Sequence, residues 1–277
     1  MKLPISVIIL TYNEELNIEQ CLKSVAGWAN EIIIVDSFSK DKTLEIAKKY
    51  TNKIAERTFI NQAEQFNWTL DNLEIKNDWI LRLDADEYLT EELKNEINEK
   101  LKNAPDNING FYIKRRIYFM SRWIKHAGVY PLWLLRLFKR GKGKSELKEI
   151  DEHIILLEGK AEELKNDFIH DDKKSLSDWI EKHNSYSTRE VETILNLKSE
   201  IPALGGQPAR KRWLKEKFYY RLPLFCRAFG YFIYRYFFCL GFLDGKEGLI
   251  YHFLRIFWYR FLLDAKIYEY RKKSEKS

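Results

Sequence analysis

The chain has few of the residues that build disulfide scaffolds or zinc sites. Its 277 residues include three cysteines, Cys21, Cys226 and Cys239, and these form no CxxC pair. This pattern fits a reducing compartment and argues against a disulfide framework or a structural zinc site. The first 13 residues also lack the cationic segment, the apolar segment and the small-residue cleavage site of a signal peptide, so we expect none.

Long apolar runs without charge are also absent. The most apolar stretch, residues 228–243, is interrupted by Arg235. Because a membrane-spanning helix needs a run of about 18 or more such residues, we expect no transmembrane helix. The composition, 45% hydrophobic and 32% charged, is that of an ordinary globular protein and excludes a disordered chain. The length allows one large domain, or one domain with an appendage.

Positive charge is concentrated in one region. Residues 205–277 carry 16 Lys and Arg against 6 Asp and Glu, whereas the other 204 residues have a net charge of −4. The same region contains 21 of the 41 aromatic residues. It follows residues 201–208, where proline and glycine break both helix and strand. We therefore predict two domains, residues 1–200 and residues 209–277.

Short β-branched runs alternate with segments of helical spacing along the first part of the chain. The predicted strands are residues 4–11, 31–35, 53–56, 79–83, 110–114, 133–138 and 153–157, and the predicted helices are residues 13–24, 42–50, 62–70 and 175–197. Asn13 is the expected N-cap of the first helix. Alternation of this kind is typical of a doubly wound α/β fold with a mostly parallel sheet.

Polar clusters follow three of the predicted strands at the point where each ends. They are residues 11–15, 36–43 and 84–87. Ligands bind beyond the carboxyl ends of the strands in sheets of this class, so these clusters are expected to form one binding site. Within the third cluster, Asp84 and Asp86 are separated by one residue. Mg²⁺ and Mn²⁺ are held by one or two carboxylates together with substrate phosphates, so this pair is a candidate metal site.

An Asp-x-Asp triplet alone is common in acidic surface turns, but its neighbours here favour a functional role. Three segments resemble the inverting family 2 glycosyltransferases in their residues, their order and their spacing. They are residues 4–15, 34–43 and 79–87. The resemblance covers residues 4–175 and implies a GT-A fold, a Rossmann-like, mostly parallel sheet flanked by helices, with a C-terminal helical extension rich in basic and aromatic residues. Features that resemble the branch with lipopolysaccharide-core glucosyltransferases are residues 130–141, Asp151-Glu152-His153, His170 and residues 241–245.

The resemblance implies a nucleotide-binding role for several residues. Thr11, Tyr12 and Glu14 would line the nucleotide pocket, with Tyr12 near the base. Asp36 matches the acid that closes the second strand and contacts the nucleoside. Many relatives have a second acid next to it, where this chain has Ser37. That departure leaves the preference for uridine open.

The resemblance also implies residues for the metal and the ribose. Asp84 would face the ribose side, and Asp86 would bind Mn²⁺ or Mg²⁺. His170 lies where relatives place a later metal-binding side chain, although a histidine taken alone is more often a hydrogen-bonded structural residue than a ligand.

An inverting transfer also needs a base that deprotonates an acceptor hydroxyl, and a carboxylate suits this role. The resemblance implies that the base falls in Asp151-Glu152-His153. Glu152 is the first choice and Asp151 the second, and the sequence does not separate them because adjacent residues on a strand point to opposite faces. Arg136, and also Arg115 or Arg116, are candidates to hold the diphosphate or an anionic acceptor.

The basic aromatic region, residues 210–273, has two interpretations. Aromatic rings sit at headgroup depth and cations meet anionic lipid, so an interfacial membrane contact fits. Lys217, Arg221, Arg227 and Arg235 fall loosely within one helical arc that would face such a surface. Alternatively, the region packs on the catalytic domain or forms a homo-oligomer interface. The acidic catalytic portion and the lack of a nucleic-acid motif argue against nucleic-acid binding.

The sequence therefore favours a metal-dependent inverting hexosyltransferase. We expect it to transfer glucose from a UDP-sugar to a lipid-linked or lipopolysaccharide-core acceptor in bacterial surface-glycan synthesis. It would act in the cytoplasm as a peripheral protein on the inner membrane. Two alternatives stay open. One is nucleotidyl transfer, although residues 11–15 lack the glycines of a phosphate loop, and the other is a non-catalytic membrane adaptor on a transferase fold.

Overall fold

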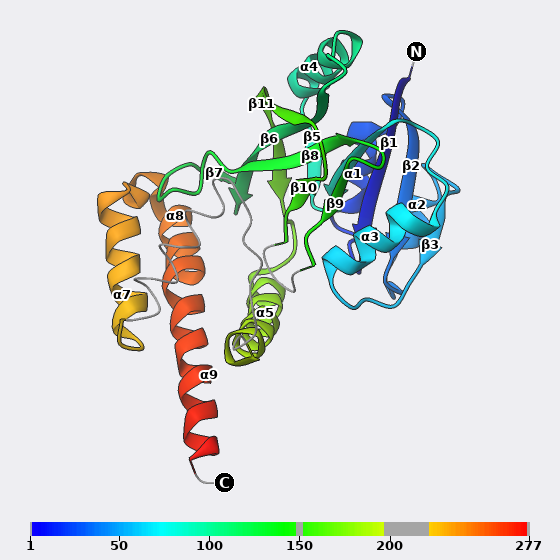
Figure 1. Ribbon diagram of the computed structural model, residues 1–277. Helices are drawn as coiled ribbons and strands as arrows, with labels where there is room; N and C mark the ends of the chain where they lie inside the picture. The colour runs from blue at the N-terminus through cyan, green and yellow to red at the C-terminus, as the bar shows by residue number, and fades with distance from the viewer. Residues whose placement is uncertain (1, 148–151, 197–221, 276–277) are drawn as a thin grey trace. The chain divides into compact units, whose positions relative to one another are not determined.

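The computed structural model describes residues 2–147, 152–196 and 222–275, and it divides into two compact units (Figure 1). The sheet unit consists of Met1–Lys125 and Val129–Lys174, and the helical unit of His126–Gly128 and Ser175–Ser277. The predicted domain boundary at residues 201–208 lies outside the described residues. Within the described ones, the helix after Lys174 groups with the C-terminal helices.

The sheet unit is built on a nine-stranded mixed sheet in the order β3-β2-β1-β4-β8-β6-β11-β5, with β7 paired to β6. Neighbours within the β3-β2-β1-β4 part are parallel, whereas β8 is antiparallel to both β4 and β6. This arrangement confirms the predicted α/β class. The strands are β1 (Leu3–Thr11), β2 (Ala29–Asp36), β3 (Ile54–Glu56), β4 (Trp79–Asp84), β5 (Glu87–Leu89), β6 (Ile108–Phe119), β7 (Arg122–Ile124), β8 (Trp133–Lys139) and β11 (Lys160–Asp171).

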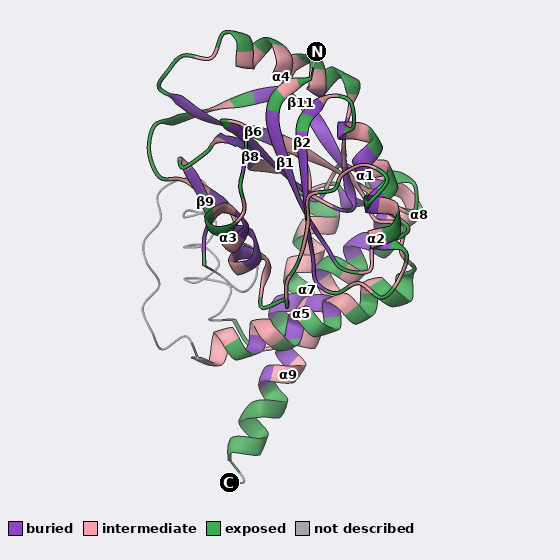
Figure 2. Ribbon diagram, turned by 90° about the vertical axis from the view of Figure 1, so that its right-hand side faces the viewer, coloured by how far each residue is buried: buried purple, intermediate pink, exposed green. Residues whose placement is uncertain are grey.

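Both faces of the sheet are covered, which explains why β1 and β2 are mostly apolar. Side chains alternate between the faces, so Val7 and Ile9 join one apolar cluster and Ile8 and Leu10 join the other. Figure 2 shows these strands as buried. The first cluster is covered by α1 (Ile18–Val25), α2 (Thr43–Ala47) and α4 (Glu91–Lys102). The second is covered by α3 (Gln62–Asn72) and by the hairpin of β9 (Gly143–Ser145) and β10 (Ile154–Leu156).

The first helix begins later than the sequence predicts. Asn17, and not Asn13, occupies the N-cap position of α1. Asn13 has a positive φ of 50°, and its backbone N–H donates to the Ser39 hydroxyl at 2.8 Å. The expected helix start was wrong because residues 12–16 form a loop whose polar groups bond to the loop after β2.

The helical unit contains four α-helices within the described residues. It also has two π-helical turns and one 3-10 turn. The α-helices are α5 (Leu176–Asn196), α7 (Cys226–Ile233), α8 (Gly245–His252) and α9 (Tyr259–Ser274), and the turns are η2 (Tyr234–Phe238), η3 (Gly241–Asp244) and η4 (Phe253–Trp258). No helix in the described part of the chain is both long enough and apolar enough to span a membrane.

Buried ion pairs fix the interior of the helical unit. Arg227 donates through Nε to Asp264 at 2.8 Å, and both side chains are buried. Arg235 bonds to the carbonyl of Ala127 and, at 2.6 Å, to the Tyr231 hydroxyl. The prediction that Arg227 lies on a lipid-facing arc was therefore wrong, since its guanidinium group is buried inside the unit, whereas Arg235 is half-buried and its lipid contact stays a prediction. Lys217 and Arg221 lie outside the described residues.

Candidate active site

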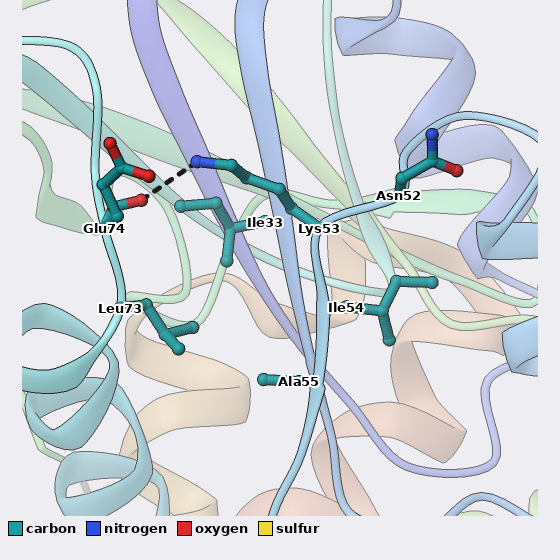
Figure 3. A pocket seen from close by; sticks show the side chains of 7 residues that line it. All are labelled: Ile33, Asn52, Lys53, Ile54, Ala55, Leu73 and Glu74. Carbon is teal, nitrogen blue, oxygen red and sulfur yellow. Dashed lines mark hydrogen bonds between the residues drawn. The ribbon is translucent and has the colours of Figure 1, made fainter.

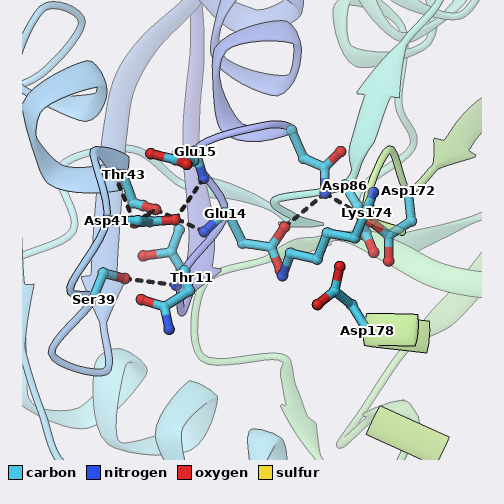
Figure 4. Close-up of polar contacts among 12 residues, drawn as sticks. Thr11, Glu14, Glu15, Ser39, Asp41, Thr43, Asp86, Asp172, Lys174 and Asp178 are labelled. Atoms are coloured by element: carbon cyan, nitrogen blue, oxygen red, sulfur yellow. Dashed lines mark hydrogen bonds and ion pairs between the residues drawn. The ribbon is translucent and has the colours of Figure 1, made fainter. Parts of the chain in front are cut away.

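The loops that follow β1 and β2 are bonded to each other at the carboxyl edge of the sheet (Figure 4). Thr11 and Asp36 are register partners at the ends of these two strands. The Thr11 hydroxyl donates to Asp36 Oδ1 at 2.8 Å, and Ser39 donates to the same oxygen at 2.6 Å through its hydroxyl. Asp36 is thereby buried in one fixed orientation. The side chain of Tyr12 is 54% exposed beside it.

Glu14 is held inside this loop structure, with 12% of its side chain exposed. Its backbone N–H donates to the Thr43 hydroxyl at 2.7 Å, and its carboxylate receives Lys174 Nζ at 2.6 Å and Asn17 Nδ2 at 2.8 Å. Burial raises the pKa of Glu14, with a further increase from Asp86 and a partial offset by Lys174. Its predicted contact with the nucleotide stays a prediction.

Asp84 ends β4 beside β1, where it is the register partner of Leu10. Its carboxylate lies 3.1 Å from Arg136 Nη2 and 3.6 Å from Arg82 Nη2. Burial alone would raise the pKa of Asp84, but Arg136 and Arg82 outweigh it and lower the pKa to about 2. Asp84 is therefore a half-buried carboxylate that is ionised at neutral pH.

Glu87, which the sequence analysis did not single out, is a central residue of this edge. Its fully buried carboxylate is 2.8 Å from Arg136 Nη2 and accepts the backbone N–H of Asp84 at 3.0 Å. Burial raises the pKa of Glu87 to about 7, partly offset by Arg136 and increased further by Asp84. The signal in the sequence was a third acid directly after the Asp-x-Asp triplet. Arg136, expected to hold a diphosphate, here contacts the carboxylates of this motif.

Asp86 and His170 come together from two strand ends. His170 on β11 is the register partner of Glu87 on β5, and its Nδ1 lies 3.2 Å from Asp86 Oδ1. Burial would lower the pKa of His170, but Asp86 outweighs it and raises the pKa. A carboxylate and an imidazole this close suit Mn²⁺ or Mg²⁺ when phosphate oxygens complete the shell. Among the described residues, no group of three or more His, Cys, Asp or Glu side chains forms a metal cluster.

Glu152 is tied to the acidic edge by an arginine that lies inside β4. Arg82 Nη2 donates to Glu152 Oε1 at 3.0 Å, and the Arg82 side chain is buried over the ring of Phe66. Arg82 thereby links Glu152 to Asp84. Sequence reasoning missed Arg82 because it occupies the middle of an apolar strand. Asp151, the alternative base, lies outside the described residues.

A separate pocket lies beside β3 and does not contain the predicted site residues (Figure 3). Its lining is mainly aliphatic, and its charged members are Lys53 and Glu74. Lys53 Nζ donates to the Glu74 carbonyl at 3.1 Å. The carboxylates at the ends of β1, β2 and β4 are absent from this lining, so the pocket gives no reason to move the candidate site.

The fold, a mixed α/β sheet in which β2 and β4 end in the fixed carboxylates of Asp36 and Asp84, is that of the GT-A glycosyltransferases. The model of the family described as Glycosyl transferase family 2 matches residues 6–154, and the chain belongs to that family.

Three similar proteins agree with this assignment. The lipopolysaccharide core biosynthesis glycosyltransferase LpsC of Rhizobium meliloti (strain 1021) is 29% identical over 97% of this chain and 93% of that protein. An uncharacterized glycosyltransferase of Rickettsia bellii (strain RML369-C) is 42% identical over 93 residues, 34% of this chain and 31% of that protein. The fold is similar to that of the mannosyltransferase PcManGT from Pyrobaculum calidifontis, solved with GDP-Man and Mn²⁺. That likeness has a TM-score of 0.52 and 14% identity, and covers 96% of this chain and 87% of that one.

Proposed function

We propose that the chain transfers a hexose, with inversion, from a UDP-sugar to a lipopolysaccharide-core or lipid-linked acceptor, with Mn²⁺ or Mg²⁺ as cofactor. The observation that carries the proposal is the pairing of Asp86 with His170, 3.2 Å apart, at the sheet edge where Asp36 and Asp84 are fixed. The similarity to LpsC supports the lipopolysaccharide acceptor. Glucose as the sugar rests on the resemblance of residues 130–141 to glucosyltransferases.

Asp36 is the proposed nucleoside contact. Thr11 and Ser39 occupy Oδ1, and the Ser39 backbone N–H donates to Oδ2 at 2.7 Å. A carboxylate fixed in this way loses little further freedom when it accepts a hydrogen bond from a ligand. The exposed ring of Tyr12 is available to pack on the base, and Asp84 is the proposed contact on the ribose side.

Asp86 and His170 are the proposed metal ligands. An ion bound there would neutralise the charge that develops on the departing diphosphate. The two side chains attract each other in its absence, since Asp86 raises the pKa of His170. Loss of the His170 proton therefore accompanies metal binding, because the neutral imidazole is the ligand.

Glu152 is the proposed base. Its carboxylate would accept the proton of the acceptor hydroxyl as that oxygen attacks the anomeric carbon from the face opposite the nucleotide. The Arg82 hydrogen bond at 3.0 Å fixes the position of one carboxylate oxygen. Arg82 is thus a proposed positioning residue.

The helical unit is the proposed membrane contact, within residues 210–273, on the cytoplasmic face of the inner membrane. Large apolar side chains are exposed on this unit, and Phe238 has 75% of its surface exposed. Exposed apolar patches of this kind mark interaction surfaces, and aromatic rings are favoured at the lipid interface. A homo-oligomer interface is the competing occupant of the same surface.

The test is nucleotide release from a panel of UDP-, GDP- and dTDP-sugars, with Mn²⁺ or with EDTA. The panel includes GDP-mannose because the structurally similar mannosyltransferase binds that donor. We expect metal-dependent release from a UDP-hexose, lost in Asp86→Ala and retained in the surface control Asp71→Ala. Nucleotide release that is unchanged by EDTA would contradict the assignment of Asp86 and His170 as metal ligands. Absence of both release and nucleotide binding would favour a non-catalytic adaptor.

A further inference from the structure

One stretch of the sheet unit has a charge that the reaction above does not use. Residues 111–133 contain five Lys and Arg and no Asp or Glu. They form β6, β7 and the start of β8. On one side of these strands lie two cations and three aromatic rings, here called the basic aromatic face. Its members are Lys114, Arg116, Trp123, Tyr130 and Trp133.

A single buried carboxylate organises this face. Asp167 on β11 is 5% exposed and is the register partner of Lys114. Arg116 donates to it at 2.9 and 3.2 Å, the Tyr130 hydroxyl lies 3.1 Å from both of its oxygens, and Lys114 Nζ lies at 3.3 Å. One negative charge therefore orients two positive charges and leaves a net charge of +1.

Aromatic rings interleave with these cations. The Arg116 guanidinium lies 4.3 Å from the centroid of the Trp123 ring, and Lys114 Nζ lies 5.3 Å from that of Trp133. Trp123 and Tyr130 meet edge to face at 5.3 Å. All three rings are partly exposed, and the side chains of Lys114 and Arg116 are 18% and 29% exposed. Solvent weakens the attraction between a cation and an anion less when the cation is partly buried than when it is fully exposed.

The basic aromatic face lies on the same side of the sheet as Arg82, which holds Glu152. Lys114 is paired with Trp133, and two residues earlier Tyr112 is paired with Leu135. Leu135 belongs to the apolar cluster that also contains Ile8, the register partner of Arg82. Paired residues in a sheet point to the same side. Lys114 and Arg82 therefore share a face.

The nucleotide end of the proposed site lies elsewhere in the strand order. Asp36 and Asp84 follow β2 and β4, whereas the basic aromatic face is built on β6, β8 and β11, on the far side of β4. β4 therefore separates the basic aromatic face from the proposed nucleoside contact Asp36, which leaves this face available to a molecule other than the nucleotide.

We propose that the basic aromatic face is an acceptor subsite for a glycan that carries an anionic group, a phosphate or a carboxylate, next to the sugar that is modified. This inference rests on the proposed transferase function. Lys114 and Arg116 would bind the anion, since ammonium and guanidinium groups pair well with phosphate and carboxylate. The rings of Trp123, Tyr130 and Trp133 would pack against the apolar face of a sugar ring.

The experiment is calorimetric binding of glucose 6-phosphate, glucuronate and neutral glucose to the full chain saturated with UDP and Mn²⁺. We expect at least one of the two anionic sugars to bind about tenfold more tightly than glucose, which corresponds to one charge-assisted hydrogen bond. Glucose 6-phosphate and glucuronate separate the two possible sources of the charge. Lys114→Gln and Arg116→Gln should each remove this preference, Arg116→Lys should restore part of it, and the exposed control Lys49→Gln should leave it unchanged.

Three results would overturn the proposal: equal binding of all three sugars, anion binding that is unchanged by both substitutions, and anion binding that appears only when UDP is left out. The last would assign the face to the donor diphosphate. Lys114→Gln guards against a folding artefact, because it leaves the Arg116–Asp167 contact in place. Failure of the transferase proposal has a separate signature, which is the absence of nucleotide release from every donor whatever the sugars do.

Discussion

In the sheet unit, buried charged side chains gather at the carboxyl edge of the sheet, whereas in the helical unit they pair within the interior. Side chains of alternating charge form a chain that ends beside Asp86, and they are, in order, Glu152, Arg82, Asp84, Arg136 and Glu87. In the helical unit, Arg227 and Asp264 neutralise each other inside the fold. Buried charge alone therefore does not mark a site, and its place at the end of parallel strands is the feature that does.

The two units also differ in where their apolar side chains lie. Strands β1 and β2 of the sheet unit are buried on both faces (Figure 2). The helical unit exposes aromatic side chains such as Phe229 and Phe238. The sheet unit thus resembles a self-contained catalytic domain. The proposed contact with a membrane or a second copy lies on the helical unit, and the contrast can be tested by matched substitutions in the two units.

The largest expected effect is on acceptor-dependent transfer in Glu152→Gln. Loss of the proposed base should lower transfer to a lipopolysaccharide-core oligosaccharide by about 10² to 10⁴-fold. Donor hydrolysis by water without acceptor should fall much less, because donor binding does not depend on this carboxylate. Product formation measured by mass spectrometry separates the two rates. Glu158→Gln, an exposed acid in the same region, is the control, and equal losses in both variants would remove Glu152 from its role.

The next effect is on stability, and it belongs to the helical unit. Asp264→Ala leaves the buried Arg227 guanidinium without its carboxylate and removes the acceptor of the Phe225 backbone N–H. We expect a loss of about 3–5 kcal/mol in the free energy of unfolding of this unit, measured by urea titration. Glu269→Ala, which breaks an exposed pair with Lys273, should cost less than about 0.5 kcal/mol. UDP binding should survive in both variants if the sheet unit folds independently.

A smaller effect is the pH dependence of the helical unit through His183. Its ring stacks on Trp179 with centroids 3.5 Å apart and meets Tyr259 edge to face. Burial, together with the nearby charges of Arg255 and Lys182, lowers the pKa of His183 to about 3. In the unfolded chain His183 binds a proton with a pKa near 6.5. The stability that the neutral ring contributes to folding is therefore present above pH 6.5 and is lost as the pH falls toward 3.

Because of His183, the free energy of unfolding should fall by about 1.4 kcal/mol for each unit by which the pH is lowered between pH 6 and pH 4. Urea unfolding of the wild type and of His183→Gln at each pH isolates it. The difference between the two proteins should shrink as the pH falls. A difference that stays constant with pH would show that the folded histidine is protonated in the normal range.

The smallest effect concerns the proposed membrane surface. Phe238→Ser removes one exposed ring and should weaken binding to vesicles of anionic phospholipid by about tenfold, by the transfer free energy of one aromatic side chain. Stability should change by less than about 0.5 kcal/mol, because the ring makes few interior contacts. Phe59→Ser, an exposed phenylalanine of the sheet unit, should leave vesicle binding unchanged. Equal binding of all three proteins would favour an oligomer interface, which sedimentation of the wild type would detect.

The sequence predicted the β3-β2-β1-β4 part of the sheet well, because β1, β2 and β4 are continuous apolar runs that need burial on both faces. The polar residues at the ends of these strands were predictable too, because each marks the point where an apolar run stops. It missed α4, whose sequence is almost entirely polar and which buries only Leu93 and Ile97. It also missed β11, in which charged residues are interspersed with the buried ones and no period of two is visible.

The site was predictable only where a residue follows a recognisable strand. Thr11, Asp36 and Asp84 could be placed at one edge from the sequence, and the structure brings them to that edge. Arg82 and Glu87 could not be assigned, since their importance depends on contacts with residues 49 to 70 positions away. Charge pairs between distant strands leave no local pattern, so tertiary contacts alone identify them.

The most direct test of the whole account is Mn²⁺ binding in the presence and absence of UDP, followed by electron paramagnetic resonance. The account predicts that UDP strengthens Mn²⁺ binding to the wild type and to Asp71→Ala, and that Asp86→Ala abolishes this effect while the chain stays folded. UDP-dependent Mn²⁺ binding that persists in Asp86→Ala would contradict the assignment of the sheet edge as the nucleotide–metal site.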